Sequence, residues 1–292
     1  MSYRLGVLVL HGIGTQTQDF SDGLIAEVGN QLGELAREVC WQPVWWAPVL
    51  ASREQKMLQD LSPECDRWES LRRFVVSTLG DAVAYQRVPS AGHRKNTYEE
   101  IHQIVAQNLH FLRERIVKSQ LQQPPMLAED VPLVVVAHSL GCHIVCNHIW
   151  DLQHPTHPRK PHGDNAFERG LTLSGMVTLG CNMPLFTLAY EHLQAIRFPA
   201  PDLVHYFKPG TSPTALQEKA RWINLYDPDD VLGFPLKPLS ADYAKAVSED
   251  RAINVGGLLD SWNPLSHNEY WTDNDVTGTV ADLLRGLLQL SR

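Results

Sequence analysis

The most constraining stretch of this sequence is a short apolar strand that runs through a serine directly into a helical segment. Residues 132–137 (PLVVVA) form a run of β-branched residues typical of a strand buried on both faces. Residues 140–152 follow at once with helical length. The chain must therefore turn sharply at Ser139, and Ala137 and Gly141 supply the small side chains that such a turn needs. We expect the turn to expose the serine hydroxyl at the carboxyl edge of a sheet.

Strands and helices alternate along the rest of the chain, which favours an α/β fold with a mostly parallel central sheet flanked by helices. The length of 292 residues fits one such domain over residues 1–292. Further strands are expected at 5–10, 44–46, 173–179, 222–226 and 252–255. Further helices are expected at 20–39, 54–61, 68–85, 98–117 and 276–290.

Two long segments, residues 40–130 and 182–220, are predicted as insertions that form a helical cap over the site. The second is rich in apolar side chains and punctuated by proline, which is compatible with binding an acyl group; ordinary helix packing explains the same pattern equally well. Its apolar residues are Phe186, Leu188, Tyr190, Leu193, Ile196, Phe198, Val204, Tyr206 and Phe207.

Composition limits the partners. The formal charge of −8 gives no basic surface, so neither nucleic acid nor an anionic membrane is expected to bind. No apolar run reaches the roughly 18 residues of a membrane span, and we expect no secretory leader before the first strand. The five cysteines lack the C-x-x-C spacing of a redox or zinc site and are expected to be reduced core thiols. A cytoplasmic location is therefore expected, with an uncharged or weakly polar small molecule as substrate and an undetermined oligomeric state.

The turn at Ala137-His-Ser139-Leu-Gly141 resembles the nucleophile elbow of α/β-hydrolase lipases and esterases, with Ala137 in place of the first glycine. This resemblance implies the α/β-hydrolase fold and a nucleophilic role for Ser139. The segment His11-Gly-Ile-Gly14 is similar to the oxyanion turn of such lipases. The resemblance then implies that the backbone amides of Ile13 and Leu140 form the oxyanion hole.

The general base and its partner acid are expected in the chain order serine, acid, histidine. His267 is the only histidine after His205, and it lies in a polar, turn-rich segment before the last predicted helix. The acid is expected just after the strand at 222–226. Asp230, which precedes a small apolar pair and a glycine, is preferred to Asp229 and Asp227.

These four motifs, HGIG, AHSLG, DPDDVLG and SHxxY, are similar to the lipase-like branch of the superfamily, of which GPI inositol-deacylases and DDHD-type phospholipases are distant members. The resemblance implies hydrolysis of a carboxylic ester, lipid-like esters included, without a metal or cofactor. Acyl transfer and thioester cleavage use the same acyl-enzyme and remain alternatives. A hydrolase-fold interaction protein that has lost activity is a third.

Several histidines other than His267 could be considered as ligands of a metal ion. His138, His143 and His148 are five residues apart, so they diverge by about 140° around a helix and cannot share one face. The histidines of the proline-rich segment 154–165 are expected to lie in a surface loop, not a metal site. Asp273-Asn-Asp lacks most ligands of a calcium loop and is expected to cap a helix.

Overall fold

The computed structural model describes residues 2–14, 16–61, 67–68, 72–73, 75–86, 96–120, 131–154, 165–188, 191–207, 210–256 and 264–291. Its centre is a six-stranded sheet in the order β2-β1-β3-β4-β5-β6, and every neighbouring pair is parallel. The prediction of an α/β fold with a mostly parallel sheet is confirmed. The strands are β1 (Leu5–Leu10), β2 (Val39–Val44), β3 (Leu133–His138), β4 (Leu173–Leu179), β5 (Arg221–Tyr226) and β6 (Glu249–Ala252).

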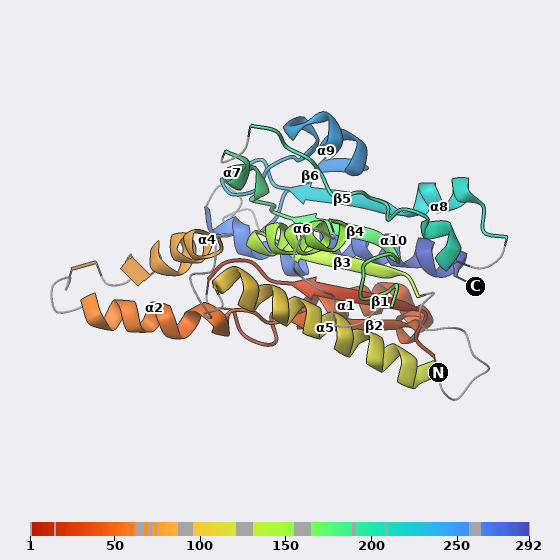
Figure 1. Cartoon of the computed structure of the whole chain (residues 1–292), viewed down its shortest axis with the longest axis horizontal. Coiled ribbons are helices and arrows are strands. Elements are labelled where there is room, and N and C mark those ends of the chain that lie inside the picture. Colours follow the sequence, from red (N-terminus) through yellow and green to blue (C-terminus); the bar gives the residue numbers. More distant parts are fainter. Residues whose placement is uncertain are drawn as a thin grey trace.

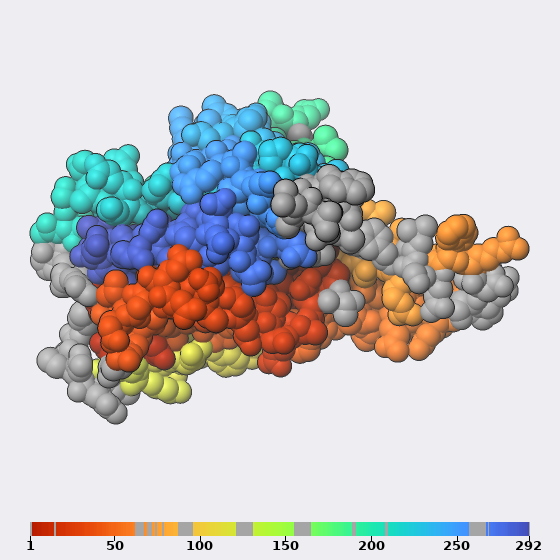
Figure 2. All heavy atoms as spheres, turned by 180° about the vertical axis from the view of Figure 1, so that it is seen from behind, coloured from red at the N-terminus to blue at the C-terminus, as the bar shows by residue number. Residues whose placement is uncertain are grey.

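Helices cover both faces of this sheet. In Figure 1, α5 and α6 lie in front of the strands, and Figure 2 shows α1 and α10 side by side on the opposite face. The longer helices are α1 (Asp22–Leu32), α2 (Pro48–Leu61), α5 (Thr97–Gln120), α6 (Leu140–Gln153) and α10 (Asn274–Leu290). The shorter helices are α4 (Asp81–Ala84), α7 (Met183–Thr187), α8 (Pro213–Lys219) and α9 (Ala241–Ala246). Single-turn or irregular helices are η1 (Gly33–Glu38), η2 (Val76–Gly80), η4 (Leu203–Tyr206), η5 (Lys237–Leu239) and η6 (Pro264–Thr272).

The three central strands explain why the sequence pattern is so apolar. Every residue of β1, β3 and β4 is buried, because helices pack on both sides of the sheet. Their apolar side chains belong to one continuous hydrophobic core. Within the described part of the chain, Cys40, Cys142, Cys146 and Cys181 are buried free thiols.

The range 40–130, predicted as an insertion, is not one throughout. It contains most of β2 and all of α5, which pack into the central α/β layer. The expected strand at 44–46 instead spans Val39–Val44; Pro43 obscured it, since proline is tolerated only in an edge strand such as this one. The expected helix at 20–39 is also divided, because Gly33 has a φ of 59° and ends α1.

The parts of these ranges outside the central layer differ from each other. Helix α2 extends beyond the end of the sheet (Figure 1). In the range 182–220, Ile196, Phe198 and Phe207 are buried in the core, whereas Leu188 is 87% exposed. Tyr190 lies outside the described residues. None of the described helices combines the length and hydrophobicity needed to cross a bilayer.

Candidate active site

The turn between β3 and α6 is as tight as the sequence indicates. Ser139 has φ 52° and ψ −122°, a backbone conformation that costs a non-glycine residue about 1–3 kcal/mol. A Cβ on Gly141 would lie 2.5 Å from the carbonyl oxygen of His11, which explains the need for glycine there. The Ser139 amide donates to the carbonyl of Leu179 at the end of β4. The elbow is therefore fixed to both neighbouring strands.

Three residues from distant parts of the chain form one hydrogen-bonded row. Oγ of Ser139 lies 2.7 Å from Nε2 of His267, and Nδ1 of His267 lies 2.8 Å from Oδ2 of Asp230. Ser139 follows β3, Asp230 follows β5, and His267 lies in η6 after β6. A carboxylate on Nδ1 fixes the proton there and leaves Nε2 free to accept the serine proton. The structure thus brings together the serine, histidine and preferred aspartate named from the sequence.

Asp230 is buried and held as an anion. Burial acts to raise its pKa, but hydrogen bonds and charge from His267 outweigh this and hold the pKa of Asp230 below its usual value. The amide of Leu232 and the hydroxyl of Tyr270 also donate to its carboxylate, both at 2.9 Å. Asp230 can therefore balance a positive charge on the imidazole.

The two other acids of this loop have different surroundings. The Asp227 carboxylate accepts the amides of Asp229 and Val255, each at 2.8 Å, and so fixes the loop after β5. The side chain of Asp229 is exposed. Of the three acids, Asp230 is the one that contacts His267.

His138 contacts the backbone of the loop that carries His267. Its Nε2 lies 2.6 Å from the carbonyl oxygen of His267, so the Nε2–H group donates a hydrogen bond to that oxygen. Burial lowers the pKa of His138 to about 3, and the ring is neutral at pH 7. His138 is therefore a positioning residue for the loop that carries His267.

The segment His11–Gly14 lies directly against the elbow. A Cβ on Gly12 would come within 2.6 Å of the Ser139 Cβ, so the backbone approaches the serine as closely as a glycine permits. Nε2 of His11 accepts the Trp46 amide at 3.1 Å, and the Gly14 amide donates to Asp81 at 2.9 Å. These contacts hold the turn in place from both ends.

The site differs from the sequence prediction in one respect. Ser139 is fully buried and His267 is only 4% exposed, whereas the sequence predicts an exposed hydroxyl. The turn at Gly12, the His267 ring and the side chain of Asn182 surround the serine. A substrate reaches Oγ only if covering groups move.

Asn182 was not singled out from the sequence. It follows β4 at the same edge of the sheet, is 97% buried, and donates from Nδ2 to the Ser139 Oγ at 3.5 Å. The sequence carries one signal for this position: Asn182 comes just after the strand that follows the elbow strand. Because parallel strands end at the same edge of a sheet, a residue at that point lies near Ser139. Within the described residues, Oδ1 of Asn182 has no hydrogen-bond partner.

Among the described residues, no group of three or more His, Cys, Asp or Glu side chains is arranged so that it could hold a metal ion. His154 uses Nδ1 to bond the carbonyl of Trp150, while His157 and His162 lie outside the described residues. Asp273 caps α10 by accepting the amide of Asp275, as the sequence predicts.

The chain resembles few known proteins in the comparisons of sequence and structure. No family model matches the chain, and no curated protein matches its sequence. A solved structure from Xanthomonas campestris pv. campestris, described provisionally as a hydrolase of the alpha/beta superfamily, covers 98% of this chain and 99% of its own at 11% identity. The TM-score of this match is 0.43. The six parallel strands, the helices on both faces and the serine elbow after β3 give this chain the α/β-hydrolase fold.

Proposed function

We propose that this chain is a serine hydrolase that cleaves a carboxylic ester through an acyl-enzyme, with Ser139 as nucleophile, His267 as general base and Asp230 as the orienting acid. The observation that supports this most strongly is the continuous row of hydrogen bonds at 2.7 and 2.8 Å through the two nitrogens of His267. Such a row needs residues from three separate loops and makes the serine hydroxyl a better nucleophile.

In the proposed reaction, Nε2 of His267 takes the proton of Ser139 as Oγ forms a bond to the ester carbonyl carbon. The charge then moves to the carbonyl oxygen, where the amides of Ile13 and Leu140 would donate to it. Collapse of this intermediate breaks the bond to the alcohol oxygen, which receives the proton from His267. A water molecule, deprotonated by the same nitrogen, then releases the acid and restores Ser139.

The amides of Ile13 and Leu140 are proposed as the oxyanion hole on two grounds. Leu140 is the first residue of α6, so its amide is among those left without an intrahelical partner at the positive end of the helix dipole. Ile13 follows Gly12, whose backbone lies against Ser139. One such donor typically contributes about 3 kcal/mol to transition-state stabilisation.

Labelling with a small fluorophosphonate tests the proposal, because this reagent requires an activated serine. Wild-type protein should be labelled, and Ser139→Ala should lose both labelling and hydrolysis of p-nitrophenyl acetate. Ser174→Ala is the matched control, since Ser174 is also fully buried but bonds the carbonyl of Thr172. Absence of labelling after prolonged incubation of folded wild-type protein would reject the enzyme and favour an inactive scaffold.

A further inference from the structure

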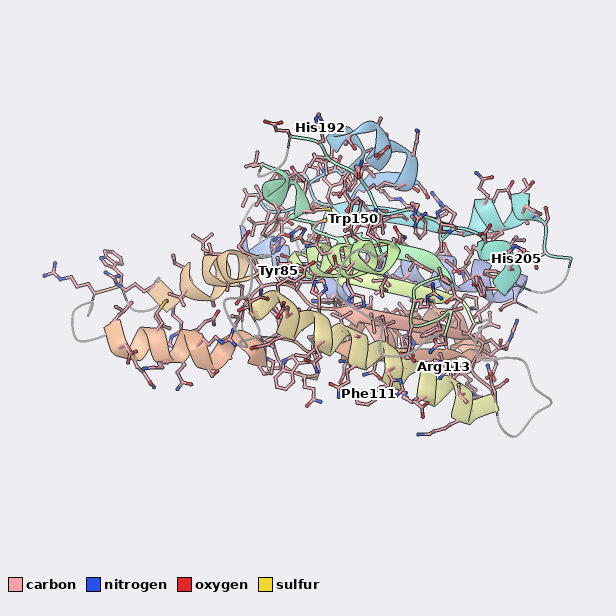
Figure 3. The ribbon with its side chains drawn as sticks, in the orientation of Figure 1. Tyr85, Phe111, Arg113, Trp150, His192 and His205 are labelled. Carbon is pink, nitrogen blue, oxygen red and sulfur yellow. The ribbon has the colours of Figure 1, made fainter. Side chains whose placement is uncertain are left out.

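A cavity of about 250 Å³ lies beside α6, the helix that begins at the proposed catalytic serine. Its described walls come from the end of α4, from α5 and α6, from α7 with the segment that follows it, and from α9. Figure 3 labels three of the lining residues, Tyr85, Trp150 and His192. The apolar part of the wall includes Trp150, Met183, Phe186, Leu193 and Ile196.

The periodicity of α6 connects this cavity to Ser139. His143, Asn147 and Trp150 line it and share one face of the helix. Ser139 caps this helix four residues before His143, which corresponds to about 6 Å along the axis. Met183, another lining residue, follows Asn182, whose amide contacts the Ser139 hydroxyl. Once the groups that cover Ser139 move, a group bound to Oγ that extended along this face of α6 would run toward the cavity.

The described lining of the cavity contains no Asp, Glu, Lys or Arg, so it lacks carboxylate, ammonium and guanidinium groups. Burial lowers the pKa of His143 to about 4, so this ring carries no charge at pH 7. A charged ligand would lose its hydration here without gaining an ion partner, which is strongly unfavourable.

One end of the cavity is nevertheless polar and held in a fixed geometry. The Tyr85 hydroxyl lies 2.6 Å from Nε2 of His102, and its ring stacks on Tyr98 with centroids 5.1 Å apart. Nδ2 of Asn147 donates to the Tyr85 hydroxyl at 3.4 Å and contacts Nε2 of His143 at 3.2 Å. The cavity therefore combines an aromatic and aliphatic wall with a small set of oriented polar groups, as ligand sites do.

The volume sets a limit on the ligand. Sites for drug-sized molecules have volumes of about 300–1,000 Å³. At about 250 Å³ this cavity fits a smaller group. A long fatty acyl chain does not match it.

We infer, on the basis of the proposed function, that this cavity binds an uncharged, ring-sized group of the ester substrate that carries a hydrogen-bonding atom at its far end. The aromatic wall contacts the ring, and Tyr85 with Asn147 bonds the polar atom. Carboxylates and long acyl chains are discriminated against.

Binding of benzamide and benzoate tests this inference, since the two ligands have the same size and differ in charge. Calorimetric titration of Ser139→Ala should give a dissociation constant at least tenfold lower for benzamide. Leu193→Trp, which fills the cavity, should abolish benzamide binding. Leu188→Trp is the matched control, because Leu188 belongs to the same segment but is 87% exposed. Equal binding of both ligands, or binding that survives Leu193→Trp, would overturn the inference.

Turnover then identifies which side of the ester enters the cavity. Leu193→Trp should lower kcat/KM at least tenfold for methyl benzoate if the ring is on the acyl side, and for phenyl acetate if it is on the alcohol side. Leu193→Trp should lower kcat/KM for ethyl acetate much less than for the affected aromatic ester, and the control Leu188→Trp should change none of the three values. A loss of the same size for all three esters in Leu193→Trp would contradict the inference. Fluorophosphonate labelling separates the two proposals: benzamide selectivity without labelling rejects the hydrolase alone, and labelling without selectivity rejects the cavity assignment alone.

Discussion

At the scale of single residues, the loop after β5 shows how surroundings assign different roles to identical side chains. Asp227 accepts two backbone amides, Asp229 faces solvent, and Asp230 bonds His267 and Tyr270. The carboxyl groups are chemically the same, so the difference lies in burial and partners. Replacing each by its neutral isostere should therefore separate catalytic from structural effects.

We predict that Asp230→Asn lowers kcat for p-nitrophenyl acetate by about three to four orders of magnitude, because the amide no longer holds the Nδ1 proton or balances the imidazolium charge. Asp229→Asn, at an exposed position in the same loop, should leave kcat unchanged. Active-site titration gives kcat per folded enzyme for both variants. An equal loss in both would contradict the role proposed for Asp230.

Much of this site follows from local sequence. The apolar strand before Ser139 and the small residues around it define the elbow, and His267 is the only histidine that follows the acidic loop. The contributions of Asn182 and Tyr270 could not be predicted, because they depend on distances between separate loops. The burial of Ser139 could not be predicted for the same reason, because the groups that cover it come from three separate parts of the chain.

At the scale of elements, the close crossing of α6 over the end of β1 fixes the site. A Cβ at Gly141 would meet the carbonyl oxygens of His11 at 2.5 Å and Leu10 at 3.0 Å. Both are backbone atoms and cannot rotate away. The helix can begin at the elbow only because this position has no side chain.

Gly141→Ala should therefore destabilise the fold by about 3 kcal/mol, the upper end for overpacking a close contact. Gly29→Ala provides the matched control. Gly29 lies within α1 and a Cβ there meets nothing within 4 Å, so alanine should stabilise the protein by up to about 1 kcal/mol. Urea unfolding measures both effects. A Gly141→Ala variant as stable as wild type would show that the helix can move away from β1.

Predictability also varies between elements. The central strands β1, β3 and β4 follow from their apolar runs, because burial on both faces leaves a clear pattern. The outer strands β2 and β6 were misplaced by several residues. Pro43 interrupts the first, and Glu249–Ala252 is charged, so neither carries the pattern of a buried strand.

At the scale of the whole molecule, several titratable groups are buried in their neutral forms. Burial lowers the pKa of His11 and His143 to about 4 and of His138 to about 3. Burial also raises the pKa of Asp81 to about 8, and Glu54 adds to this effect. These shifts link folding stability to pH.

Stability should be greatest near pH 6.5. Between pH 4 and 6.5 the three histidines bind protons in the unfolded chain but not in the folded protein, whereas the Asp81 carboxyl binds a proton in the folded protein but not in the unfolded chain. The unfolded chain therefore binds more protons in this range, so stability increases with pH. Above about pH 7 the unfolded histidines have lost most of their protons, and the proton held on Asp81 is the main difference among the described groups, so stability decreases as pH rises towards 8. Denaturant unfolding at pH 5, 6.5 and 8 measures this.

Asp81→Asn is the control for the alkaline side, because the amide can still accept from Gly14 but does not titrate. The variant should lose the decrease in stability between pH 6.5 and 8. A wild-type protein that is most stable at pH 8 would show that Asp81 is ionised in the folded state.

Both outer strands of the sheet also oppose aggregation. Pro43 in β2 lacks an amide proton, and β6 consists of only four residues, Glu-Asp-Arg-Ala. An open sheet edge is a template for pairing with another chain, and proline, charge and short length are the means by which proteins block it. The features that made these strands hard to recognise therefore also keep neighbouring molecules from extending the sheet.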